Sequence, residues 1–363
     1  MRHQPVISKL HAVCVRVPRL VFAIAASLPL ILLLLLITGL LLGGGKVRAE
    51  TADSCGGENL VTRLATTNPE ALAKARTEAA AVPNGHGLFW KIEKPGLEPS
   101  YLLGTMHVTD PRVTRMPDAA RTAFDTVDTV VIETIDILDP VKAQAAMMLK
   151  PELTMFTDGT TLTSLLNAED AHLVEAELAR RGIPLALVSR MKPWMIAGLV
   201  AQPACEIARK ADGAEFLDMK IANDAKKAGK QLLGLESIGE QIEAMADLPM
   251  EFHVRGLVET IRLADLIPDI MTTMTELYLE GEIALIMPAI LAAGPADAGE
   301  DVSGYAEFEE RIVLVRNRLM AERAAPILDK GNALIAVGAL HLPGQQGLVS
   351  LLEAAGYTLT QQQ

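Results

Sequence analysis

The chain has 363 residues, 50% of them hydrophobic and 4% aromatic, and a formal net charge of −12. Residues 1–49 hold six Lys or Arg and no acid, so residues 50–363 carry 27 Lys or Arg against 45 Asp or Glu, a net charge of −18. Such an acidic body excludes sequence-independent binding of nucleic acid, which needs a basic surface. We therefore expect no nucleic-acid partner.

The first 49 residues form a basic start followed by a long apolar run. Four Lys or Arg between Arg2 and Arg19 precede an uncharged stretch at about residues 21–42, a pattern that directs membrane insertion. The run approaches the roughly 20 residues that span a bilayer, yet Val47-x-Ala49 is an acceptable cleavage sequence. A cleaved signal peptide and a retained membrane anchor both remain open. Either one predicts an extracytoplasmic body in the cell envelope, such as the periplasm, that touches the membrane only through this segment.

Two cysteines lie in the exported body, Cys55 and Cys205. In an oxidising compartment an even pair is interpreted first as a disulfide. This bond would tie the beginning of the body to the middle of the chain. Two unrelated thiols are the alternative, and without a CxxC pair we expect no metal ligation by cysteine.

The body is predicted to alternate short apolar strands with long helical regions. The β-branched run at residues 129–132 is typical of a buried parallel strand. Helices are expected over most of residues 140–230 and 242–329. These patterns predict an α/β (α+β) fold with a central, mostly parallel sheet, surrounding helices and a large helical insertion. The expected strands lie at residues 88–92, 100–103, 129–132, 231–235, 333–337 and 357–360.

Four of these strands end near a histidine or a glutamate. Two Gly-x-x-His motifs, ending at His107 and His341, follow two strands, and Glu133 and Glu236 follow two others. Side chains at the carboxyl ends of strands in an open α/β sheet collect in one crevice, where ligands bind. Two imidazoles and two carboxylates suit a divalent ion such as Zn, Mn, Co or Fe. They equally suit metal-free chemistry with a histidine as base.

Each of these residues also has a structural interpretation. A histidine beside a buried strand usually fills a hydrogen-bonded structural role, and Glu133 alone could cap a following helix. Arg316, on an apolar helix, could form a surface salt bridge. The repetition of the Gly-x-x-His motif in matching context favours the functional interpretation.

Taken in chain order, these motifs resemble those of the TraB/GumN family, over roughly residues 56–360. The Tiki-type metalloproteases and the erythromycin-esterase/ChaN-like proteins belong to the same wider group. The residues that carry the resemblance are Trp90, Tyr101–His107, Val130–Glu133, Lys192–Trp194, Gly234–Glu236, Glu240, Gln241, Arg316, Asn317, Met320, Val337–Leu342, Gly344 and Gly347.

The resemblance implies an EreA/ChaN-like fold in which residues 50–363 form one domain with the histidines and glutamates in one pocket. Tiki-type relatives are considered divalent-metal-dependent peptidases. The candidate ligands of a divalent metal (Mn, Co or Zn) are therefore His107, Glu133, Glu236 and His341. The implied site residues are His107, Glu133, Glu236, His341, Arg316 and Asn317.

Three functions remain open at this point. The first is a metal-dependent hydrolase acting on a peptide or another small amide or ester, in which the ion lowers the pKa of its bound water towards about 7. The second is a metal-free hydrolase of the esterase type. The third is a non-catalytic envelope protein that binds haem or a polysaccharide precursor in the same crevice. The sequence leaves the substrate and the oligomeric state open.

Overall fold

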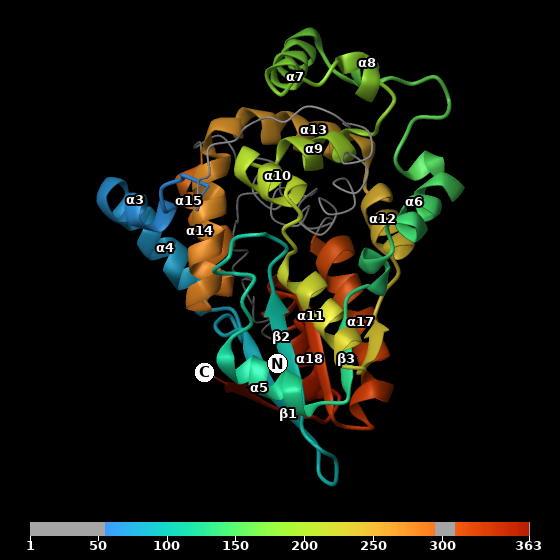
Figure 1. Cartoon of the computed structure of the whole chain (residues 1–363). Helices are drawn as coiled ribbons and strands as arrows, with labels where there is room; N and C mark the ends of the chain where they lie inside the picture. The colour runs from blue at the N-terminus through green and yellow to red at the C-terminus, as the bar shows by residue number, and fades with distance from the viewer. Residues whose placement is uncertain (1–54, 295–308, 363) are drawn as a thin grey trace, which may run out of the picture.

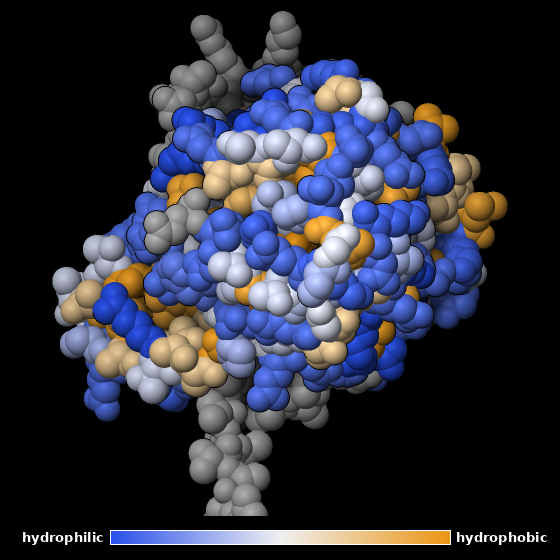
Figure 2. Space-filling model, turned by 90° about the horizontal axis from the view of Figure 1, so that it is seen from below, coloured by the Kyte–Doolittle hydropathy of each residue, from blue (hydrophilic) through white to orange (hydrophobic). Residues whose placement is uncertain are grey.

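The computed structural model describes residues 55–294 and 309–362 of the chain (Figure 1). The expected signal peptide or anchor within residues 1–49 lies outside these ranges. Within them, no helix has the combined length and apolar character that crossing a bilayer requires. Seen from below, the surface is mostly hydrophilic, with small separate apolar spots (Figure 2).

A six-stranded mixed sheet lies at the centre, in the order β4-β3-β5-β2-β1-β6. The first four strands in that order run parallel, while β1 is antiparallel to both β2 and β6. This arrangement confirms the expected α/β fold with a mostly parallel sheet. The strands are β1 (Phe89–Glu93), β2 (Ser100–Thr105), β3 (Thr129–Ile132), β4 (Gln231–Gly234), β5 (Ala333–Gly338) and β6 (Thr358–Gln362).

Helices cover both faces of this sheet because successive strand residues point to opposite sides. On one face, helices α5 and α11 pack on Leu103, Val130 and Leu334. On the other, α17 and α18 pack on Leu102 and Ile335. These four helices are α5 (Asp118–Thr126), α11 (Leu217–Lys227), α17 (Val315–Leu328) and α18 (Leu348–Ala354).

The remaining helices gather mainly above and beside the carboxyl ends of the parallel strands (Figure 1). They have their own apolar cores, in which α14 and α15 pack with α3 and α4, and α9 packs with α13. The insertion predicted from the helical middle of the sequence is therefore present. Helices α3 (Leu60–Thr67) and α4 (Pro69–Ala80) precede the sheet in the chain and pack against this insertion. Its members are α6 (Pro140–Leu149), α7 (Ala168–Arg180), α8 (Leu185–Val188), α9 (Pro193–Val200), α10 (Ala204–Ala211), α12 (Ile238–Ala246), α13 (Met250–Arg262), α14 (Ile267–Glu280) and α15 (Ile283–Ala293).

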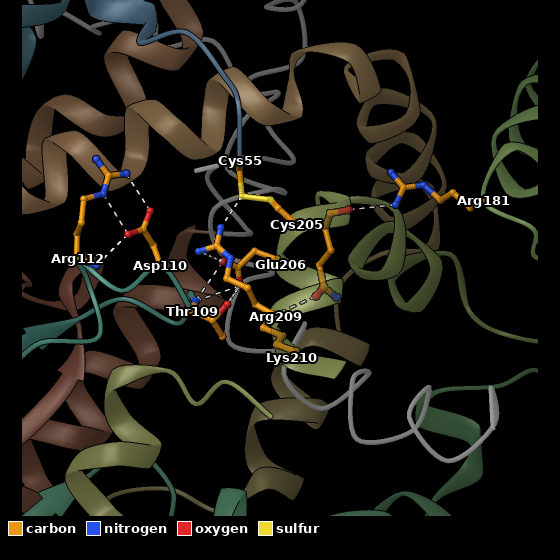
Figure 3. The surroundings of a disulfide bond; sticks show 10 residues. Cys55, Thr109, Asp110, Arg112, Arg181, Cys205, Glu206, Arg209 and Lys210 are labelled. Carbon is orange, nitrogen blue, oxygen red and sulfur yellow. Dashed lines mark hydrogen bonds and ion pairs between the residues drawn. A yellow bond between two sulfur atoms is a disulfide. The ribbon is translucent and has the colours of Figure 1, made fainter. Parts of the chain in front are cut away.

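A disulfide joins Cys55 to Cys205, across a sequence separation of 150 residues, and confirms the predicted pairing. Beside it, buried Glu206 accepts hydrogen bonds from the backbone N–H of Thr109, at 3.0 Å, and from its hydroxyl, at 2.9 Å (Figure 3). Arg209 Nη1 and Lys210 Nζ both lie 3.7 Å from the same carboxylate. We call this group the disulfide cluster: Cys55, Cys205, Glu206, Arg209 and Lys210.

Candidate functional site

The carboxyl ends of β2, β3, β4 and β5 meet at one edge of the sheet because these strands run parallel. His107 lies two residues beyond β2, and Glu133 directly follows β3. Glu236 lies two residues beyond β4, and His341 ends the short 3-10 turn after β5. The structure therefore brings the four predicted strand-end residues to the same edge.

The glycines of the two Gly-x-x-His motifs permit close contacts at this edge. A Cβ atom on Gly104 would lie 2.7 Å from Leu342 Cδ1 and 3.0 Å from Ala339 Cβ. On Gly338, a Cβ would lie 3.1 Å from Oε1 of Glu133, and the Gly338 N–H donates to that same oxygen at 2.7 Å. Each glycine thus lets one strand end lie directly against the next, as the sequence pattern predicts.

Arg316 of α17 binds both strand-end glutamates. Its Nη2 donates to Glu133 Oε2 at 2.8 Å and to Glu236 Oε2 at 2.7 Å, and its Nε donates to both oxygens of Glu236 at 3.1 Å. The amide of Gln241 donates to both glutamates, at 3.2 and 3.3 Å. All three charged side chains are buried. We call Glu133, Glu236 and Arg316 the arginine–carboxylate cluster.

Burial and mutual attraction set the charge states in this cluster. Burial alone would raise the pKa of Glu133, but the charge of Arg316, followed by the two histidines, lowers that pKa to about 2. Burial acts to lower the pKa of Arg316, and the attraction of Glu236 and Glu133 raises it instead. Glu133 and Arg316 are therefore both ionised at neutral pH.

His341 is oriented by Asn317, the next residue of α17. The Asn317 side-chain amide donates to the backbone carbonyl of Gln346 at 2.8 Å, so its Oδ1 accepts from the Nδ1–H of His341 at 2.6 Å. Nε2 of His341 therefore keeps its lone pair and lies 3.8 Å from Glu133 Oε1. Burial, followed by the charge of Arg316, lowers the pKa of His341 to about 3. This imidazole is neutral at pH 7.

His107 has a different partner, Asp218 in the first turn of α11. Its Nε2 lies 3.5 Å from Asp218 Oδ1, and within the described residues neither ring nitrogen has a hydrogen-bond partner. Burial acts to lower the pKa of His107, but the carboxylate of Asp218, with a smaller contribution from Glu133, raises this pKa above its usual value. Asp218 is not among the residues predicted from the sequence. The signal in the sequence that could have pointed to Asp218 is an acid on the same helix face as the apolar residues Leu217 and Ile221.

The predicted residues His107, Glu133, Arg316 and His341 border one cavity, of about 600 Å³ counting the open space at its mouth. Glu236 and Asn317 contact these residues without lining the cavity. The rest of the wall is largely apolar and includes a π-helical turn at Glu310–Leu314. The other lining residues are Thr105, Met106, Met274, Tyr278, Ile286, Ile312, Val313, Gly338, Ala339 and Leu340.

The four predicted metal ligands differ in their availability to an ion. His107, His341 and Glu133 face the cavity, and their imidazole and carboxylate donors suit a divalent ion. Both oxygens of Glu236 accept hydrogen bonds from Arg316. In the described ranges, no group of three or more His, Cys, Asp or Glu side chains is placed to hold a metal ion. The cavity thus offers three donors of suitable chemistry without a preformed metal centre.

Comparisons with known proteins match the chain to one family. The family model described as TraB/PrgY/gumN matches residues 88–361. Metalloprotease TIKI2 of Danio rerio is 22% identical over 320 residues, which cover 75% of this chain and 60% of that protein. Metalloprotease TIKI1 of Xenopus tropicalis is 21% identical over 319 residues, covering 75% and 61%. No solved structure matches.

The chain thus spans about 60% of the length of these curated relatives. The family match includes all six predicted site residues and Asp218, because it extends from residue 88 to residue 361. It also includes every strand of the central sheet up to the penultimate residue of β6. The chain belongs to the TraB/PrgY/gumN family.

Proposed function

We propose that this protein is an exported hydrolase that cleaves a peptide, or another small amide or ester, with the help of a divalent metal ion. The observation that carries the proposal is that His107, His341 and Glu133, from three different strand ends, border one cavity. The relatives named as metalloproteases support a peptidase-like reaction. The disulfide supports an oxidising compartment and hence export.

His107, His341 and Glu133 are the residues that would hold the ion. A bound divalent ion supplies polarisation of the substrate carbonyl and a water of lowered pKa. Two of these ligands are prepared by their neighbours in the chain. Asn317 fixes the proton of His341 on Nδ1, which leaves the lone pair of Nε2 free to bind a metal ion. Glu133 is anionic because Arg316 and the Gly338 N–H stabilise its charge.

Glu236 and Arg316 serve to hold Glu133 in place. The guanidinium contacts both carboxylates, so its position fixes the distance between the ends of β3 and β4. Ser237 and Glu240 form a capping box at the start of α12, which fixes the backbone directly after Glu236. The apolar wall opposite, including Met274 and Ile286, would exclude water and receive an apolar part of the substrate.

Metal content is the direct test of this proposal. Purified wild-type protein is equilibrated with Mn, Co or Zn, and the retained metal is measured by mass spectrometry. We expect His107→Ala and His341→Ala to lose the metal, and His172→Ala, at an exposed site on α7, to retain it. Full occupancy in both site variants contradicts the ligand assignment. Hydrolysis is measured in parallel with peptide and ester substrate arrays.

His107 favours a second candidate, a metal-free hydrolase. Its ring has no hydrogen-bond partner within the described residues, and the carboxylates of Asp218 and Glu133 raise its pKa against the effect of burial. A histidine in this state can act as a general base near neutral pH. His341 is less suited to that role because its pKa is lowered to about 3. Hydrolysis that survives exhaustive chelation supports this candidate, and loss of hydrolysis that metal restores rejects it.

A further inference from the structure

Asp218 is a buried carboxylate beside the apolar core of the sheet. It lies in the first turn of α11 and is 2% exposed. Its neighbours on that helix, Leu217, Ile221 and Ala222, pack into the apolar core against the sheet. Burying a carboxylate without enough partners is costly. In the described part of the chain, Oδ2 of Asp218 is buried with no hydrogen-bond partner.

The other oxygen of Asp218 lies between two residues of the first Gly-x-x-His motif. Oδ1 accepts a hydrogen bond from the hydroxyl of Thr105 at 2.9 Å and lies 3.5 Å from Nε2 of His107. The ring of Phe216, two residues earlier, lies 5.2 Å from the His107 ring at a tilt of 40°. Two residues at the start of α11 therefore lie against the His107 ring: Asp218 beside its Nε2 and Phe216 beside its face.

A carboxylate only accepts hydrogen bonds, so this contact favours the proton of His107 on Nε2. The lone pair then lies on Nδ1. His341 has the opposite arrangement, because Asn317 holds its proton on Nδ1 and leaves the lone pair on Nε2. We propose that Asp218 is the positioning residue of His107: it fixes the ring and its proton, and leaves Nδ1 for the substrate or ion.

This role adds a positioning residue to the proposed function. It rests on that function only in experiments that measure hydrolysis or bound metal. In an oriented imidazole, the partner of the second nitrogen controls which nitrogen reacts or binds metal. Asp218 and Asn317 would then be equivalent parts, one for each Gly-x-x-His motif. They come from helices α11 and α17, which lie on opposite faces of the sheet.

The test is the tautomer of His107 in purified protein labelled with ¹⁵N-histidine, measured by long-range ¹H–¹⁵N NMR at pH 8.5. The His107 signal is assigned by its loss in His107→Gln. We expect the Nε2–H form in wild type. In Asp218→Asn we expect Nδ1–H, because an amide N–H₂ in the place of Oδ1 has two protons, one to donate to the Thr105 hydroxyl oxygen and one to donate to Nε2. Asp218→Ala, which removes the partner, should show no strong preference.

Asp224→Asn is the matched control, since Asp224 lies on the same helix and pairs with Arg121 at the surface. It should leave the His107 signal unchanged. An unchanged His107 tautomer in both Asp218→Asn and Asp218→Ala overturns the positioning role, whatever the activity. If a substrate is cleaved, kcat should fall about 10²–10⁴-fold in Asp218→Asn with a smaller change in KM. A tautomer switch in a protein that cleaves nothing would leave the positioning role standing and reject the hydrolase.

Discussion

The arginine–carboxylate cluster lies at the ends of β3 and β4, and the disulfide cluster contacts Thr109 beyond the end of β2. Both bury charge, but in opposite proportions. In the first, one guanidinium is shared by two carboxylates beside an open cavity. In the second, two cations share the single carboxylate of Glu206, which also accepts the backbone N–H of Thr109. The first cluster therefore carries an excess of negative charge, and the second an excess of positive charge.

Burial acts to lower the pKa of the buried cations in both clusters, but the net pKa shifts of Arg316 and Lys210 have opposite signs. The two glutamates outweigh burial and raise the pKa of Arg316. For Lys210, burial outweighs the attraction of Glu206 and lowers its pKa. The positive charge of Arg316 is thus fully compensated by its two carboxylates, whereas that of Lys210 is only partly compensated by Glu206. The first cluster thus holds its charges at the cavity, whereas the second lies where a disulfide ties two distant segments together.

Removing Arg316 should have the largest effect. Arg316→Met leaves two buried carboxylates without their cation and should lower the free energy of unfolding by about 3–5 kcal/mol. Urea denaturation measures this cost. Arg318 lies on the same helix as Arg316, and Arg318→Met, which breaks an exposed pair with Glu310, should cost about 0–1 kcal/mol.

A combined variant keeps this prediction testable if Arg316→Met fails to fold. Arg316→Met with Glu133→Gln and Glu236→Gln removes the unpaired charges, and it should recover most of the lost stability. Equal instability of the single and the combined variant would show that the charges do not determine the cost.

Removing the disulfide should have the next largest effect. Cys55→Ser with Cys205→Ser frees a loop of 150 residues and should cost about 2–4 kcal/mol. Wild-type protein under reducing conditions should match the double variant in urea denaturation. If the disulfide cluster has only a structural role, the tautomer of His107 should be the same in both forms. A changed tautomer would show that this cluster also controls the site.

Neutralising Glu206 should have an intermediate effect. Glu206→Gln keeps the size of the side chain but removes the charge that pairs with Arg209 and Lys210, and we expect a loss of about 1–3 kcal/mol. Amide exchange at Thr109 should become faster, because its N–H donates to this carboxylate. Glu169→Gln, at the exposed start of α7, is the control. Unchanged exchange at Thr109 would contradict the assigned hydrogen bond.

The pH dependence contributed by Lys210 should be the smallest effect. Its pKa is lower in the folded than in the unfolded chain, so the unfolded chain binds more protons as pH rises towards 10.5. The penalty for burying the charged amine is therefore relieved with rising pH. Wild type should gain stability relative to Lys210→Met, by at most about 1.4 kcal/mol per pH unit.

Urea denaturation at pH 7, 8.5 and 9.5 measures this slope, with Lys74→Met at an exposed position as control. A slope of the opposite sign would mean that Glu206 compensates Lys210 fully. The two clusters would then no longer differ in how well their cations are compensated.

The sequence by itself determined the strands and the residues that end them. Apolar runs such as residues 129–132 and 333–337 are local signals, because a buried parallel strand needs apolar side chains on both faces. Parallel strands end at one edge, so His107 and His341 could be predicted to share a site from their position after two such strands. The disulfide could be predicted because only two cysteines lie in residues 50–363.

Only the tertiary structure decided how these residues are paired. Arg316 is one of several arginines on its helix, and its contact with Glu133 and Glu236 depends on how α17 packs on the sheet. Asp218 is 111 residues from His107 in the sequence, and no local pattern connects an acid on α11 to the end of β2. Long-range packing selects such partners, because burial makes a charged group stable only where its counterpart is within reach.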